Sequence, residues 1–190
     1  ETEISEYYIG GVNSLSHLVP DYKQYYDKMH IDAKGIIYSG NLLINSKKIK
    51  ADGIIAEFKK LSKNDYMFQD MDILNIVCKG KIKYLPPKFC LSTFINEYAV
   101  KDTSKLVDIW KEEEIQHALK SGLVHYNGAK PWKTYCINFD IWWEYYRKSP
   151  FYDEKFYFDF FNNKLNELDQ LTLWKRVKIL LRYFVYGRKK

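Results

Sequence analysis

One nine-residue segment limits the possible folds of this chain more than any other. Residues 125–133 read His-Tyr-Asn-Gly-Ala-Lys-Pro-Trp-Lys and follow the short apolar run Leu123-Val124. The apolar run predicts a strand that ends near residue 125. Glycine and proline mark turns, so the segment itself is expected to be a loop. The fold must therefore place a loop rich in polar side chains directly after a strand.

The loop combines three residue types that suit a charged ligand. A neutral imidazole at His125 is a good ligand for a divalent ion such as Mn²⁺ once carboxylates complete the shell. Gly128 has no Cβ, so its N–H can lie close to a diphosphate oxygen, and the Lys130 ammonium would neutralise that charge. The alternative is structural: His125 as a core or loop histidine, and Gly-Ala-Lys-Pro as a plain turn.

A second segment predicts a strand followed by a helix. Residues 40–45 read Gly-Asn-Leu-Leu-Ile-Asn, and this run is typical of a buried strand. Ser46 is expected to cap the helix that follows. The apolar positions of that helix are Ile49, Ile54, Ile55, Phe58 and Leu61.

A third segment, residues 68–75, reads Phe-Gln-Asp-Met-Asp-Ile-Leu-Asn. It predicts a helix whose first turn carries two carboxylates, where the amino-terminal end of the helix dipole favours negative charge.

In this order, the three segments resemble glycosyltransferase family 8, which includes the lipopolysaccharide α-galactosyl- and α-glucosyltransferases and glycogenin. The resemblance runs from about residue 4 to about residue 135. Its sharpest matches are Ser39-Gly40, residues 42–45, Gln69-Asp70, residues 72–75 and residues 125–132. It implies an α/β protein that forms the carboxyl-terminal portion of a GT-A fold, with a mixed sheet flanked by helices. We expect residues 1–150 to form this partial domain and residues 151–190 to form a helical connector and a basic amphipathic tail.

The resemblance also assigns roles to residues of this chain. His125 matches the family's metal ligand, for Mn²⁺ or Mg²⁺, and Asp70 matches the aspartate that faces the donor sugar. Gln69 lies beside it in the same block and is the second expected catalytic residue. Asp72 is expected to be a helix-start carboxylate. The matched donor-binding positions are Ser39, Gly40, Asn127, Gly128 and Lys130.

Two positions depart from the family pattern. Tyr38 stands where the family commonly has asparagine, and Met71 stands where it commonly has glutamine. Both departures remove amide groups from the expected sugar pocket.

The family's Asp-x-Asp metal motif is expected upstream of a stretch that resembles residues 3–10, and it does not occur there in this sequence. Asp70-Met71-Asp72 has the right spacing, but it aligns with a different family block and begins a helix. We therefore expect this chain to be a fragment that lacks part of the donor site and is inactive in isolation.

The complete enzyme implied by the resemblance is a retaining, metal-dependent hexosyltransferase. It would move galactose or glucose from a UDP-sugar to a saccharide or lipid-linked saccharide acceptor, as in lipopolysaccharide or other cell-surface glycan synthesis. Two alternatives stay open: a degenerate family member, and a non-catalytic basic module that binds a membrane surface.

The net charge of +6 resides in the last twenty residues, which hold seven basic residues and no acidic one. On a helical wheel the apolar residues of this tail share one face, which is typical of a helix lying in anionic lipid headgroups. The expected membrane-binding residues are Trp174, Lys175, Lys178 and Arg182. An ordinary amphipathic helix packed on the body is the alternative, and the absence of any recognised nucleic-acid motif argues against nucleic acid as a partner.

The chain contains three cysteines, and none forms a Cys-x-x-Cys pair. They indicate free thiols in a reducing compartment. Together with the basic tail, they predict a cytoplasmic protein peripheral to the inner face of the membrane.

Overall fold

The computed structural model describes residues 3–186, apart from the side chains of residues 168, 169 and 182–186. Two compact units form within the chain, Glu1–Lys130 and Pro131–Lys190, and each is described by itself. This division follows the packing of the chain. The boundary at residue 150, which the sequence predicts between family domain and tail, stays a prediction.

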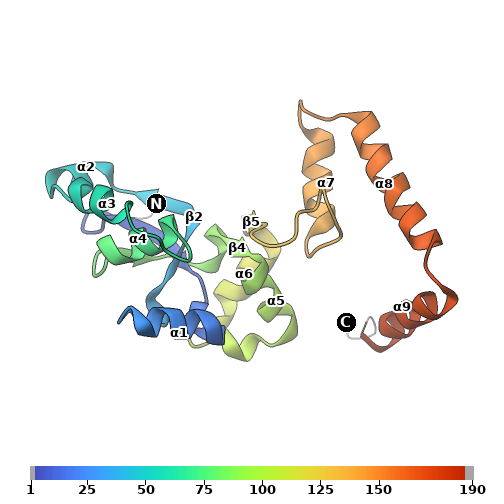
Figure 1. Ribbon diagram of the computed structural model, residues 1–190, viewed down its shortest axis with the longest axis horizontal. Helices are drawn as coiled ribbons and strands as arrows, with labels where there is room; N and C mark the ends of the chain where they lie inside the picture. Colours follow the sequence, from blue (N-terminus) through green and yellow to red (C-terminus); the bar gives the residue numbers. More distant parts are fainter. Residues whose placement is uncertain (1–2, 187–190) are drawn as a thin grey trace. The chain divides into compact units, whose positions relative to one another are not determined.

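A three-stranded mixed sheet forms the centre of the first unit (Figure 1). Strand β1 (Ile9–Asn13) lies between β2 (Ile37–Ile44), which is antiparallel to it, and β3 (Ile82–Tyr84), which is parallel to it. All five residues of β1 are buried, because β1 is the central strand and apolar clusters pack around its side chains, such as Ile9 and Val12. A Cβ at Gly11 would lie 2.5 Å from Cδ1 of Ile37, so glycine is needed for the close approach of β2.

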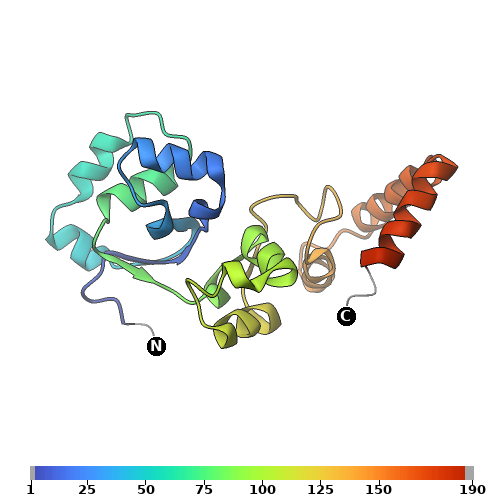
Figure 2. The same ribbon diagram turned by 90° about the horizontal axis from the view of Figure 1, so that it is seen from below.

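Helices flank this sheet, as the sequence predicts. They are α1 (Pro20–Lys28), α2 (Ser46–Ala51), α3 (Ile55–Leu61) and α4 (Asp70–Val77). Figure 2 shows α1 (blue) and α4 (green) on the same side of the sheet. Two apolar clusters fill the space between helices and sheet, one around Tyr26, Ile36 and Met71 and the other around Ile9 and Cys78.

A smaller two-stranded parallel sheet, β4 (Leu91–Ser92) and β5 (Val124–His125), completes the first unit with α5 (Thr93–Lys101) and α6 (Glu112–Ser121). Four short 3-10 turns connect the elements: η1 (Ser16–Leu18), η2 (Ala33–Gly35), η3 (Pro87–Phe89) and η4 (Thr103–Lys105). The predicted strand end at residue 125 is confirmed, because β5 stops at His125 and the loop begins there.

The structure corrects two details of the second sequence segment. Strand β2 begins at Ile37 and lies at the edge of its sheet, which leaves Leu43 and Ile44 exposed, so the run is not a buried strand. The helix cap is Asn45, whose Oδ1 accepts a hydrogen bond from the Lys48 N–H at 3.0 Å, and Ser46 is the first helical residue.

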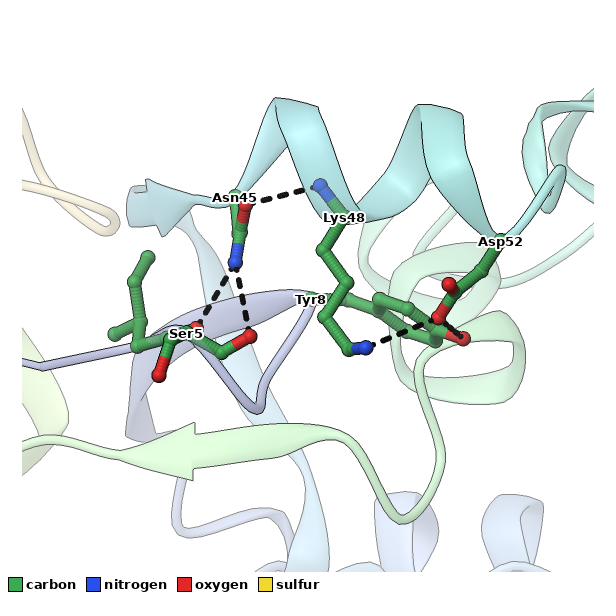
Figure 3. A network of polar contacts seen from close by, with 6 residues as sticks. Ser5, Tyr8, Asn45, Lys48 and Asp52 are labelled. Atoms are coloured by element: carbon green, nitrogen blue, oxygen red, sulfur yellow. Dashed lines mark hydrogen bonds and ion pairs between the residues drawn. The ribbon is translucent and has the colours of Figure 1, made fainter.

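A polar network ties α2 to the segment before β1 (Figure 3). The Asn45 amide donates to the carbonyls of Ile4 and Ser5, at 3.1 and 3.3 Å. At the other end of α2, Asp52 accepts the Tyr8 hydroxyl at 2.8 Å and pairs with Lys48 at 3.2 Å. Both ends of this two-turn helix are therefore held against the chain that enters the sheet.

The second unit consists of helices α7 (Phe139–Lys148), α8 (Glu154–Asp169) and α9 (Leu173–Tyr186). Its centre is Trp143, which is buried against the rings of Phe160 and Phe161 on α8 and donates its indole N–H to the Pro131 carbonyl at 3.2 Å. Helix α8 covers most of the expected connector, whose role between family domain and tail stays a prediction. No helix in the described part of the chain has the length and apolar character needed to cross a bilayer.

Candidate functional site

The first unit contains a cavity of about 550 Å³ that brings the loop after β5 together with β2 and α5. Five of the predicted site residues line it: Ser39, Gly40, His125, Asn127 and Gly128. The remaining lining residues are hydroxyl-bearing, aromatic or apolar, with one carboxylate: Ser14, Ser16, Val19, Tyr22, Tyr38, Phe68, Met71, Thr93, Phe94 and Glu97.

His125 lies at the wall of this cavity and is half-buried. Burial, followed by the charge of Lys130, lowers the pKa of His125 below its ordinary value, so the neutral imidazole is favoured. A neutral imidazole offers a lone pair to a metal ion. The ring is thus both accessible from the cavity and in the protonation state that a ligand requires.

Gly40 makes room for this imidazole. A Cβ at position 40 would lie 2.7 Å from both Cε1 and Nε2 of His125, a distance that real Cβ atoms essentially never show. The predicted donor-binding glycine on β2 and the predicted metal ligand at the end of β5 are therefore in contact, although 84 residues separate them in sequence.

Asn127 connects the loop to both neighbouring elements. Its Oδ1 accepts the Thr93 N–H at 2.9 Å, and its Nδ2 donates to the Tyr38 hydroxyl at 3.3 Å. Burial raises the pKa of Tyr38, so the phenol remains protonated. Tyr38 stands where asparagine is expected from the family resemblance. The Asn127 amide lies beside this position, but it comes from the loop and not from β2.

Gly128 faces the cavity without steric need for glycine. A Cβ there would meet Thr93 at 3.6 Å or more, which is ordinary contact. Nothing in the protein itself therefore explains glycine at this position, which is the result expected if the residue leaves space for a ligand.

Three predicted site residues do not line the cavity. Gln69 and Asp70 are exposed, and the lining residues of their segment are the neighbouring Phe68 and Met71. The Lys130 ammonium donates to the backbone carbonyl of Tyr126. The roles assigned to Gln69, Asp70 and Lys130 stay predictions.

Asp72 holds this segment in place. It is fully buried and accepts hydrogen bonds from the hydroxyls of Tyr25 and Tyr26, at 2.8 and 2.7 Å, and from the Phe68 N–H at 2.9 Å. It lies in the first turn of α4, where the sequence places it. These contacts support the turn at Gln69, whose backbone has the positive φ of 47° that is uncommon outside glycine.

Many residues of the cavity wall are not predicted from the sequence. Thr93, Phe94 and Glu97 project from the first turns of α5, and Glu97 also pairs with Lys101 at 3.3 Å. Ser14 and Ser16 come from the turn after β1, where their hydroxyls are 2.7 Å apart. No spacing in the sequence identifies these residues, because each lies in a segment that reads as an ordinary helix start or turn.

The cavity wall contains one imidazole, His125, that would suit a metal ion. Among residues 3–186 no three or more histidine, cysteine or acidic side chains gather as a metal site would require. The donor groups in the lining, the neutral His125 imidazole and the Glu97 carboxylate, fit part of a divalent-ion shell and do not complete it.

Most of the described part of the predicted tail lies on α9. Leu173 and Trp174 are 77% and 82% exposed, and Lys175 and Lys178 are also exposed. The side chain of Arg182 lies outside the described residues. The three cysteines are free thiols, as the sequence predicts.

Comparisons with solved structures show which fold this is. The apo form of the bifunctional glycosyltransferase WbbM matches with a TM-score of 0.65 and 19% identity, over 82% of this chain and 30% of that one. The galactosyltransferase LgtC in complex with donor and acceptor sugar analogs matches with a TM-score of 0.60 and 20% identity, over 82% and 56% of the two chains. An active-site mutant of LgtC gives a TM-score of 0.60 and 21% identity, over 82% and 57%.

These similarities confirm the predicted GT-A fold, while the chain spans between about a third and somewhat over half of each matched protein. No curated protein sequence matches it. The sequence profile of Glycosyl transferase family 8 matches residues 1–136, which is most of the chain. With the fold and the cavity it encloses, this match places the chain in glycosyltransferase family 8.

Proposed function

We propose that this protein is a retaining, metal-dependent hexosyltransferase that takes galactose or glucose from a UDP-sugar. The acceptor would be a saccharide or a lipid-linked saccharide of a surface glycan such as lipopolysaccharide. The supporting observation is that His125, Gly40, Asn127 and Gly128, from two distant segments, meet at one cavity in a member of this family.

The described residues can bind and orient such a donor. Hydroxyls of Ser14, Ser16 and Thr93 line the cavity with aromatic rings from Tyr22 and Phe94. This mixture suits a sugar, because a few polar groups fix its orientation and the rings cover its apolar face and exclude water. The open space at Gly128 would admit a diphosphate oxygen close to the backbone.

His125 would hold a divalent ion together with carboxylates from outside the described residues. When bound, such an ion acts as a Lewis acid on the diphosphate leaving group. In this proposal Asp70 and Gln69 orient the donor sugar and Lys130 adds positive charge. All three must turn toward the cavity when the donor binds, because none lines it here.

The test is calorimetric titration of UDP-galactose and UDP-glucose, with and without Mn²⁺, into the full-length protein. We expect Mn²⁺-dependent binding that weakens by roughly tenfold or more in His125→Ala, the usual cost of damaging a metal site. His117→Ala, an exposed histidine on α6, is the matched control and should bind as the wild type does.

Equal affinity of His125→Ala and wild type would refute the assignment of the metal ligand. No binding of either UDP-sugar to the wild type would instead favour a degenerate family member, as the departures at Tyr38 and Met71 suggest.

We also propose that α9 attaches the protein to an anionic membrane surface on its cytoplasmic side. The helix leaves Leu173, Trp174, Leu180 and Leu181 between 55% and 82% exposed. The basic residues Lys175 and Lys178 lie on the opposite side of the helical wheel, the arrangement of an interfacial helix.

Vesicle flotation tests this attachment. The protein should float with vesicles that contain phosphatidylglycerol more than with phosphatidylcholine alone, and Trp174→Ser with Leu181→Ser should abolish the difference. Phe151→Ser is the control, since Phe151 is 83% exposed in the same unit but outside α9. Retention of single-stranded DNA without flotation would contradict the proposal and favour a nucleic-acid partner.

A further inference from the structure

A second cavity of about 420 Å³ lies in the first unit, and the proposed function does not use it. It shares no lining residue with the first cavity, and at the end of β1 the adjacent residues Asn13 and Ser14 line the second and the first cavity respectively. Its wall combines two aromatic rings, Tyr84 and Trp110, with three charged side chains, Lys34, Asp108 and Glu114.

Trp110 lines this cavity and carries a hydrogen-bond donor that is unpaired within the described part of the chain. The side chain is only 6% exposed and packs in the apolar cluster that also contains Leu106 and Ile115. Its indole N–H has no hydrogen-bond partner among the described residues. Among those residues, only His17 Nδ1 is a side-chain polar atom that is both fully buried and without a partner. The Trp110 N–H is therefore not fully buried. A largely buried indole thus keeps an N–H that the described residues leave unpaired and not sealed from solvent, on a residue that lines the cavity.

The charged groups are also available to a ligand. Within the described part of the chain, the Lys34 ammonium and the Asp108 carboxylate make no ion pair or hydrogen bond. Glu114 uses Oε2 to accept the Lys111 N–H at 3.0 Å, at the start of α6, and its other oxygen makes no such contact. One donor and two acceptors with a net charge of −1 disfavour an anion, and the acidic groups are too few for a metal site in residues 3–186.

Tyr84 provides a flat apolar surface. It is 54% exposed, and its hydroxyl donates to the Gly35 carbonyl at 2.9 Å, which fixes the ring. A fixed aromatic ring loses little conformational entropy when a ligand stacks on it. The ring lies in the same wall as N–H donors and carboxylate acceptors, the combination that a neutral sugar with its hydroxyls and apolar face requires.

We infer that this cavity is a second saccharide-binding site, which holds a neutral sugar unit between Tyr84 and the polar groups of Lys34, Trp110 and Asp108. The class of ligand rests on the proposed function, since a transferase acting on glycans meets saccharides longer than one unit. The existence of the site rests only on its own geometry.

NMR of the ¹⁵N-labelled protein tests this inference, because Trp110 is the only tryptophan in residues 1–130. Five indole N–H signals are expected, one per tryptophan, and Trp110→Phe identifies the one that belongs to position 110. Lactose and maltotriose are the probes, and glycerol is the control for unspecific effects of a polyol. At least one saccharide should shift the Trp110 signal in a saturable way.

Variants of exposed residues then locate the site. Tyr84→Ala and Asp108→Asn should each raise the Kd of the saccharide by roughly fivefold or more, through loss of stacking or of an acceptor. Tyr84→Phe should retain most of the affinity because it keeps the ring. Matched controls are Tyr145→Ala and Asp65→Asn, which alter exposed residues outside the cavity and should leave the Kd unchanged.

The inference is overturned if neither saccharide shifts the Trp110 signal, if glycerol shifts it equally, or if the cavity variants bind as the controls do. The calorimetric titration of UDP-sugars reports on the first cavity separately. Donor binding without a Trp110 response would refute the second site alone, and a saccharide response without donor binding would refute the proposed function alone.

Discussion

At the scale of single residues, the candidate site depends on one close contact. The His125 imidazole occupies the space that a side chain at position 40 would fill, 2.7 Å from where a Cβ would lie. Gly128 lines the same cavity with a position where a Cβ meets only ordinary contact at 3.6 Å. The two glycines therefore differ: Gly40 admits a side chain of the protein, whereas no contact within the protein requires glycine at position 128.

This difference predicts opposite behaviour of two alanine variants. Gly40→Ala should displace the imidazole, shift the His125 ring signals in NMR of the free protein, and cost about 1–3 kcal/mol of stability by overpacking. Gly128→Ala should leave the His125 ring signals unchanged and alter the stability by less than about 0.5 kcal/mol. It should weaken only donor binding. Unshifted His125 signals in Gly40→Ala would contradict the contact.

A second residue-scale prediction separates two aspartates of one helical turn. Asp72 is fully buried with three donors, whereas Asp70 is exposed. Asp72→Ala should lower the free energy of unfolding by about 3 kcal/mol or more, since each buried unpaired donor costs about 1–3 kcal/mol. Asp70→Ala should cost less than about 1 kcal/mol, the value of a charge at a helix start. Urea unfolding measures both, and equal losses would refute the distinction.

At the scale of elements, tertiary contacts determine which residue caps helix α2. Both Asn45 and Ser46 are good capping residue types. The Asn45 amide can reach the carbonyls of Ile4 and Ser5 while its oxygen caps the helix, so Asn45 satisfies two segments at once (Figure 3). Ser46 is left as the first helical residue.

Alanine variants of these two positions test the choice. Asn45→Ala should destabilise the protein by about 1–2 kcal/mol, because a cap and two tertiary hydrogen bonds are lost. Ser46→Ala should change stability by less than about 0.5 kcal/mol. Urea titration measures the free energy of unfolding of both variants. A larger loss in Ser46→Ala than in Asn45→Ala would indicate that Ser46 caps the helix, as the sequence predicts.

At the scale of the whole molecule, two histidines make the stability of the folded protein depend on pH. Burial, and then the charge of Lys34, lowers the pKa of His17, and His125 shifts in the same direction. Both side chains are neutral in the folded and unfolded states above the ordinary histidine pKa of about 6.5. As the pH falls through that value, the unfolded chain takes up protons more readily than the folded protein, so stability decreases.

We therefore expect the midpoint of thermal unfolding to fall as the pH is lowered from neutral through the ordinary histidine pKa. The fall should be smaller in His17→Gln, which removes one of the two groups, and unchanged in His117→Gln, an exposed control on α6. A steeper fall in His17→Gln than in the wild type would reverse the assigned direction of the pKa shift.

The sequence by itself determined the family, the α/β class and the local starts and stops, because these depend on neighbouring residues. The strand end at His125, the carboxylates in the first turn of α4 and the free cysteines all follow from residue type and spacing. The tertiary structure alone decided that Gly40 meets His125, that Phe68 and Met71 rather than Gln69 and Asp70 face the cavity, and that α5 supplies its wall. It also decided that β2 is an edge strand and that a second cavity forms around Trp110. The reason is physical, because these features depend on pairing and packing between segments that are distant in sequence. A local pattern of residues does not determine which side of a turn will contact a segment tens of residues away.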